Sequence, residues 1–296
     1  MAATRTLPRS AIGERLRSDA RARFALTVLL LMILAGVLAP VLAPFDPNAQ
    51  LDIAHLQTQA PSAAHPFGTD PFSRDVLSRV LYGTRVSLSV ALIAVSISMV
   101  FGTCVGAIAG YAGGAIDALI SRFVDAALSI PAVLLLIVVI ALWGQISVVA
   151  LTLLLAGVGW FAVSRIVRAE ALAVRGSEFV VAARALGMPA WRVLLRHVLP
   201  NALGPALVTA TLAVGNTILL EAGLSYLGIG VRPPTPSWGN IIEDGSARVS
   251  DAWWLTVFPG LAILITVFAC NALGDALRDA LDPRQLHSTP DDVPFA

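Results

Sequence analysis

Long apolar runs constrain this chain more than any other feature of its sequence. The first run, 24–43, has about 20 residues, and a helix of that length crosses the roughly 30 Å hydrocarbon layer of a bilayer. It is too long for the core of a signal peptide, so we expect it to be retained. Five more runs follow, at 86–109, 126–143, 146–163, 202–220 and 252–273. The pattern predicts an all-α integral membrane protein with six transmembrane helices.

The composition excludes several classes of protein. Of 296 residues, 57% are hydrophobic and only 13% are charged, whereas about a quarter of a soluble domain is charged. The net charge of +1 argues against binding to nucleic acid. All twenty basic residues are arginine, so the lysine that a phosphate-binding G-x-x-x-x-G-K-[ST] loop requires is missing. We therefore expect any ATP hydrolysis to be carried out by a partner protein.

The distribution of arginine predicts the orientation of the spans. Six spans place both termini on the same side of the membrane, together with every second loop. Fifteen arginines fall on that side and five on the other. Since cytoplasmic segments are enriched in basic residues, both termini are expected in the cytoplasm.

These spans divide the chain into segments with assigned sides. The expected segments are a cytoplasmic tail at 1–23, the first span at 24–43, an extracytoplasmic segment with an interfacial helix at 44–85, a five-helix core at 86–274 and a cytoplasmic tail at 275–296. The core contains a cytoplasmic loop at 170–200 and an extracytoplasmic loop at 223–251. Gly102, Gly106 and Gly110 recur every fourth residue in the second span, a spacing that favours close helix packing.

The cytoplasmic loop predicts two helices that meet at an elbow. The first, at about 170–186, should bury one stripe formed by Phe179, Val180, Ala183 and Leu186. Gly187 suits the left-handed conformation that ends a helix.

The second helix of the elbow is expected at 189–199. Pro189 suits its first position, and the helix should end before Pro200. Its expected apolar ridge, beside Arg192 and Arg196, consists of Trp191, Leu194, Leu195 and Val198. This shape favours a knob that enters a partner's groove over a helix that lies on the membrane surface.

The two extracytoplasmic segments contain distinctive polar residues. Asp70 is expected to cap a helix that begins at Pro71, and the apolar residues expected at the membrane interface are Phe72, Val76, Val80 and Leu81. Prolines at 233, 234 and 236 should stiffen the second segment, which either folds over the span ends or contacts a partner. For Glu221, at the end of a span, a structural hydrogen bond to this loop is preferred over contact with a substrate amine.

Four stretches resemble one family of transporters. Ala182-Ala183, Gly187 and Val198-Leu199-Pro200 have the spacing of the "EAA" loop of ATP-binding-cassette importer permeases, although Val181 replaces the glutamate of its general consensus. The other three are HPFGTDPFSRDVLSR at 65–79, LSYLGIGVRPPTPSWG at 224–239 and LRDALDPR at 277–284. Together they are similar to the second, C-type permease subunit of dipeptide, oligopeptide and nickel importers.

The resemblance implies a type I importer permease fold with a cytoplasmic coupling helix, in a bacterial plasma (inner) membrane. The residues implied to couple to an ATPase are Ala182, Ala183, Gly187, Pro189, Trp191, Arg192, Leu195, Arg196 and Pro200. The implied partners are a sister permease, two ATP-binding subunits or domains that hold ATP and Mg, and an extracytoplasmic solute-binding protein. The expected contacts with that binding protein are Asp70, Arg74, Asp75, Arg232 and Trp238.

Several functions remain open at this point. The sequence contains no recognisable catalytic set, metal-ligand motif or cofactor motif, so a non-catalytic subunit is expected. Peptide is the first choice of solute, and nickel or another small solute the second. Two other classes are an ion-coupled secondary transporter, disfavoured because few charges lie in the spans, and a membrane anchor for an enzyme.

Overall fold

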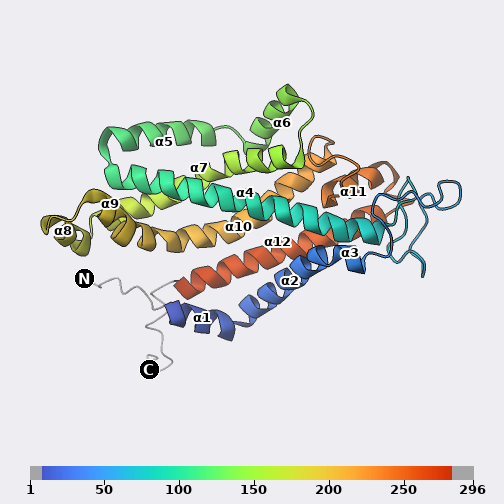
Figure 1. The fold of residues 1–296 in the computed structure, drawn as a ribbon, viewed down its shortest axis with the longest axis horizontal. Helices are drawn as coiled ribbons and strands as arrows, with labels where there is room; N and C mark the ends of the chain where they lie inside the picture. The colour runs from blue at the N-terminus through green and yellow to red at the C-terminus, as the bar shows by residue number, and fades with distance from the viewer. Residues whose placement is uncertain (1–8, 282–296) are drawn as a thin grey trace, which may run out of the picture.

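The computed structural model describes residues 9–281, where regular structure is helical apart from one isolated β-bridge between Thr69 and Asp75 (Figure 1). The helices are α1 (Arg9–Ser18), α2 (Ala20–Val37), α3 (Ala39–Leu42), α4 (Val76–Ala112), α5 (Gly114–Leu128), α6 (Ala132–Trp143), α7 (Val148–Arg175), α8 (Glu178–Ala185), α9 (Ala190–Val193), α10 (Leu199–Tyr226), α11 (Trp238–Gly245) and α12 (Trp254–Leu281). A π-helical turn, Leu194–Val198, joins α9 to α10, and a 3₁₀ turn, Ser246–Arg248, follows α11.

Within residues 9–281, five helical stretches are long and apolar enough to cross a membrane: α2, α4, α7, Ala190–Tyr226 and α12. This confirms the prediction of a helical membrane protein. Several helices are longer than the apolar runs from which they were predicted, because polar residues at the span ends are also helical. At 37 residues, α4 is about 55 Å long, so it extends beyond a bilayer's hydrocarbon layer.

The third predicted span, 126–143, is not one straight helix. Its residues belong to α5 and α6, which meet at an angle of 82°. Pro131 lies at the break; it has no N–H to donate, and it disfavours the helical conformation of Ile130. The chain therefore has up to six spans within its described part, the sixth only if the bent pair counts as one.

The glycines of the second span allow α4 and α7 to lie in contact. A Cβ atom built on Gly102 would lie 2.7 Å from the carbonyl oxygen of Trp160, and one on Gly110 would lie 2.5 Å from that of Arg168. A Cβ on Gly106 would meet the carbonyl oxygen of Ser164. The packing interpretation of this spacing is confirmed, because a side chain at any of the three positions would push against backbone.

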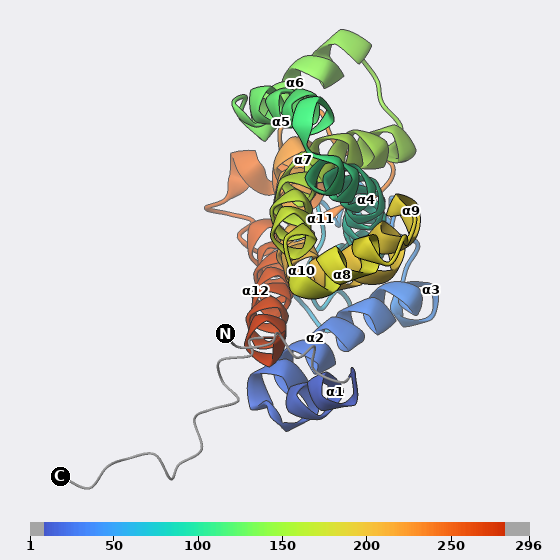
Figure 2. The same ribbon diagram turned by 90° about the vertical axis from the view of Figure 1, so that its left-hand side faces the viewer.

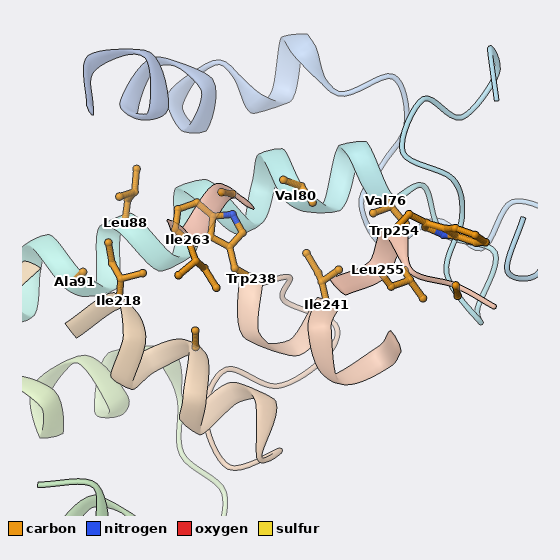
Figure 3. Packing of buried hydrophobic residues seen from close by; sticks show 13 residues of the cluster. Val76, Val80, Leu88, Ala91, Ile218, Trp238, Ile241, Trp254, Leu255 and Ile263 are labelled. Carbon is orange, nitrogen blue, oxygen red and sulfur yellow. The ribbon is translucent and has the colours of Figure 1, made fainter. Parts of the chain in front are cut away.

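The main apolar core lies where α4, α10, α11 and α12 meet. Trp238 at the start of α11 is completely buried, and its indole lies beside Ile263 of α12 and near Val80 of α4 (Figure 3). Ile218 of α10 and Leu255 of α12 belong to the same cluster. The short helix α11 thus closes one end of the bundle.

The two ends of the bundle carry different elements. The helices α8 and α9, the start of α1 and the end of α12 lie at one end, while α3, α11 and the loop 43–75 lie at the other (Figure 1). Viewed from the α8 end, α5 and α6 form one flank, and α1 and α2 lie on the opposite one (Figure 2). This arrangement agrees with an even number of crossings, although it does not assign either end to the cytoplasm.

The predicted tails are partly helical, and their remainders, 1–8 and 282–296, lie outside the described residues.

The segment 44–85 differs from its prediction. Residues 43–75 form a folded loop in which the described backbone contains no helix, and α4 begins only at Val76. The helix cap is Asp75, whose side chain accepts a hydrogen bond from the Ser78 N–H, rather than Asp70. Val76 and Val80, expected at the membrane interface, are buried in the main core. Phe72 alone among these expected interfacial residues is exposed.

Candidate functional site

The elbow segment, residues 176–198, projects from one end of the bundle between α7 and α10. The helix α7 runs past Glu170 to Arg175, and the first short helix, α8, begins only at Glu178. At the end of α8, Gly187 has φ +80°; its N–H bonds to the Arg184 carbonyl at 3.0 Å, and the Met188 N–H bonds to the Ala183 carbonyl at 3.1 Å. These two bonds form a Schellman motif, which confirms the predicted left-handed glycine.

The second helix of the elbow was predicted to end before Pro200, but the helical path continues through that residue. Pro189, with φ −65° and ψ 145°, precedes α9, and the chain continues through the π-helical turn into α10. The Leu199 N–H bonds to the Leu194 carbonyl, one residue further back than in an α-helix. Pro200 then occupies the first turn of α10, where its missing N–H costs little.

One face of the elbow segment packs against the bundle. Val180, Ala183, Val193 and Val198 are buried together with Ala171 of α7, and Tyr111 of α4 packs against them. Phe179 and Leu186 do not belong to this buried face, contrary to the predicted stripe. Their positions follow from α8 being only eight residues long, so that it buries one narrow line of small side chains.

The opposite face of the elbow segment is apolar and exposed. Leu186 is 88% exposed, Trp191 60% and Leu195 55%. Trp191 and Leu195 are four residues apart and share one side of the helix, and the Arg192 guanidinium stacks 5.2 Å from the Trp191 ring centroid. We call Leu186, Trp191 and Leu195 the knob; it lies past the end of α7 and forms an exposed apolar patch of the kind that marks interaction sites.

The remaining predicted coupling residues surround the knob. Ala182, Gly187, Pro189, Arg192, Arg196 and Pro200 are exposed, whereas Ala183 is buried beneath them. The elbow segment therefore brings the predicted coupling residues together on one projection. Among the described residues, no other charged side chain forms an ion pair with Arg192 or Arg196.

At the other end of the bundle, four charged side chains form the outer cluster: Asp70, Arg74, Arg79 and Asp244. Asp70 accepts hydrogen bonds from Arg74 Nε at 2.5 Å and Arg79 Nη1 at 2.6 Å. Asp244 of α11 accepts from Arg74 Nη2 at 2.8 Å and lies 3.1 Å from Arg79 Nη1. Burial raises the pKa of Asp244, and its partners Arg79 and Arg74 oppose that rise. The cluster joins the loop 43–75, α4 and α11.

The side chains expected to contact a binding protein are mostly buried. Asp70, Asp75 and Trp238 have no exposed surface and Arg74 retains 7%, so the structure does not present these four to a partner. Asp75 is engaged by His65 Nδ1 at 2.9 Å as well as by Ser78. Arg232 is half-buried and remains partly accessible. The side chains of the sequence motif at 65–79 are therefore mostly internal and hold this end of the protein together, instead of lining its surface.

Glu221 has a structural environment. It is completely buried, and Ser87 of α4 and Ser225 of α10 each donate a hydrogen bond to it at 2.7 Å. The Ser225 hydroxyl also accepts from the N–H of Val231, in the proline-rich loop, at 2.9 Å. This supports the interpretation of Glu221 as a link between the span and that loop.

Comparison with known proteins identifies the family. Residues 102–287 match the family described as the binding-protein-dependent transport system inner membrane component. The chain belongs to this family. Its members are permease subunits of ABC transporters, and residues 10–61 match the N-terminal transmembrane domain of oligopeptide transport permease C.

Relatives within the family align along most of the chain. A dipeptide transport system permease protein of Alkalihalophilus pseudofirmus is 40% identical over 279 residues, covering 92% of this chain and 88% of the relative. A dipeptide transport system permease protein of Haemophilus influenzae is 40% identical, covering 89% and 90%. An oligopeptide transport system permease protein of the same organism is 37% identical, covering 92% and 90%. The chain is therefore an ABC transporter permease, and the likeness extends over about nine-tenths of it.

Proposed function

We propose that this chain forms half of a heterodimeric translocation pathway in an ATP-driven importer of di- or oligopeptides. The named relatives support the peptide class, because two of them are dipeptide and one is an oligopeptide transport permease. The other half is a sister permease subunit. Two ATP-binding subunits or domains supply ATP and Mg, and an extracytoplasmic solute-binding protein delivers the peptide. Both termini lie in the cytoplasm.

The observation that carries this proposal is the exposed knob on a short, glycine-ended elbow. Trp191 and its neighbours present apolar surface of the kind that dominates protein–protein binding energy. The buried face of the elbow segment packs on the ends of α4 and α7, so a partner that moves the knob moves these helices. Closure of the ATP-binding subunits around ATP then shifts the spans between inward-open and outward-open arrangements.

The outer cluster positions the opposite surface. Asp70 and Arg74 tie the loop 43–75 to α11, and the binding protein docks on the exposed residues of these elements and on the partly accessible Arg232 in the loop before α11. The buried acids and arginines thus act by holding the docking surface in place.

The proposal is tested by reconstituted transport. The chain, its sister permease, the ATP-binding subunits and the binding protein are placed in liposomes, and uptake of labelled dipeptide, labelled oligopeptide and nickel is measured with ATP or a non-hydrolysable analogue inside. Peptide uptake that requires ATP hydrolysis and the binding protein is expected. Uptake of nickel alone would reassign the solute, and uptake driven by an ion gradient without ATP would contradict the proposal.

A further inference from the structure

A cavity of about 320 Å³ lies beside the elbow segment. The ends of α4 and α7, the helix α8 and the elbow itself form its walls. Its lining residues are Tyr111, Ala112, Arg175, Arg184, Met188 and Ala190. The cavity is large enough to admit a whole side chain from another protein.

The two charged side chains that line this cavity are both arginines, and the nearest acid, Asp117, interacts with Arg175 only at a distance. Arg175 and Arg184 both line it, and neither has an ion pair or a hydrogen bond to an acidic side chain of residues 9–281. The acid close to Arg175 along the bundle, Asp117, is engaged by Arg168, whose Nη2 donates to it at 2.7 Å. The buried or half-buried arginines Arg74, Arg79 and Arg168, in contrast, each bind an aspartate.

The position of the cavity identifies the source of the missing negative charge. Met188 and Ala190 line the cavity, and their neighbours along the chain, Leu186 and Trp191, belong to the knob. The cavity therefore adjoins the knob along the chain, within reach of a protein docked there. Arginine pairs well with carboxylates, because its planar guanidinium donates two parallel hydrogen bonds to the two oxygens.

We propose that Arg175 and Arg184 form a socket for an acidic side chain of the ATP-binding subunit that docks on the knob. The inference rests on the proposed function and adds a second contact to it. The knob supplies apolar area, and the socket fixes orientation, since charge complementarity mainly sets register and association rate. Because Arg175 ends α7 and Tyr111 lies near the end of α4, the socket also connects the partner directly to the two helices that pack along the glycine stripe.

The test measures binding of the ATP-binding subunit to the intact pair of permeases in nanodiscs, at 50 and 300 mM NaCl. The variants are Arg184→Gln, Arg175→Gln and the double change. The matched control is Arg278→Gln, an exposed arginine at the end of α12. Arg184 is exposed on α8, so its replacement is not expected to disturb folding.

We expect the double variant to bind about tenfold more weakly at low salt and to lose most of the salt dependence that the wild type shows. The control should bind within about twofold of the wild type, since screened surface charges contribute little. Replacing either arginine with glutamate should abolish binding, and reversing one acidic residue on the ATP-binding subunit to arginine should restore it.

Three results would overturn the socket. Unchanged affinity and salt dependence in the double variant, with binding still weakened by Trp191→Ala, would remove the socket while leaving the proposed function intact. An effect that is seen only in nanodiscs with anionic lipid, and is lost with phosphatidylcholine alone, would assign the arginines to lipid headgroups. Failure of the wild-type pair to bind any ATP-binding subunit would contradict the proposed function as well.

Discussion

Gly187 determines the direction of the elbow at the scale of a single residue. Its φ of +80° is one that side-chain-bearing residues rarely adopt, and apart from its two neighbours along the chain, no residue has an atom within 4 Å of where a Cβ would be placed. The cost of a substitution there is therefore backbone strain alone. We expect Gly187→Val to cost roughly 1 to 3 kcal/mol and to re-aim α9, whereas Gly187→Asn should be milder because asparagine tolerates this conformation.

The Gly187 prediction is checked by co-purification of the ATP-binding subunit with each variant. Valine should lose the subunit on washing, and asparagine should retain most of it. Equal retention by the two variants would show that the left-handed conformation is not needed for docking.

For Asp70, the structure replaces the predicted role of a helix cap with that of a buried counter-charge to two arginines. As a helix cap it would tolerate asparagine, but both of its carboxylate oxygens are in use: Oδ1 accepts from the N–H groups of Phe72 and Arg74, and Oδ2 from two guanidinium groups. An amide would turn a donor toward other donors. Arg79 has few other hydrogen bonds to compensate for the loss of Asp70, since its Nε and Nη2 have no partner among the described residues.

We therefore expect Asp70→Asn and Asp70→Ala to be similarly harmful, at about 3 to 5 kcal/mol, because each leaves a buried arginine without its counter-charge. The measurement is the melting temperature and membrane level of the purified chain. Asp251→Asn, at an exposed aspartate, is the control and should leave both unchanged. Tolerance of Asn but not Ala would restore the capping interpretation.

At the scale of the helices, contact between α4 and α7 depends on glycine. Gly106→Ala places a methyl group against the Ser164 carbonyl, which is backbone and cannot rotate away, so we expect a loss of about 1 to 3 kcal/mol. Gly157→Ala, on the open side of α7, is the matched control and should stabilise the helix by up to about 1 kcal/mol. Thermal unfolding followed by circular dichroism separates the two, and identical melting temperatures would mean that the helices do not approach this closely.

The helices also show which features the sequence could predict. The length of the apolar runs was enough to predict the number of membrane-spanning helices to within one. Gly187 and Pro189 were enough to predict that the chain turns between two short helices. Pro131 was overlooked as a break because the residues on both sides are apolar, and apolar length says nothing about direction. Pro200 was wrongly expected to end a helix, since a π-helical turn before it removes the conflict with the preceding carbonyl.

The outer cluster could not be predicted in the same way. Its four charges come from the loop 43–75, α4 and α11, and the partner of Arg74 in α11 is 170 residues away. Contacts between residues so far apart in the sequence depend on tertiary packing, which the sequence alone does not reveal. A polar motif before a membrane span is most simply interpreted as exposed to solvent. Arg74 and Asp75 were therefore expected at the surface, whereas both are buried.

At the scale of the whole molecule, the proposed orientation is directly testable. In a background lacking Cys104 and Cys270, a cysteine at Ala185 of α8 should react with a membrane-impermeant maleimide only after the membrane is opened. A cysteine at Ser250, in the exposed stretch after α11, should react in intact cells, because the arginine bias places α8 inside. Labelling of both positions from the same face would contradict the assignment of the two ends.

In the proposed function, the knob transmits ATP-driven movement to the spans of a peptide importer. The most direct measurement is the ATP hydrolysis rate of the reconstituted complex with and without peptide-loaded binding protein, compared among wild type, Trp191→Ala and Trp143→Ala. Trp143, at the end of α6, is as exposed as Trp191 but lies away from the elbow segment. We expect loaded binding protein to stimulate the wild type and the Trp143 variant. The Trp191 variant should lose this stimulation while still pairing with the sister permease. Full stimulation of the Trp191 variant would contradict this role of the knob.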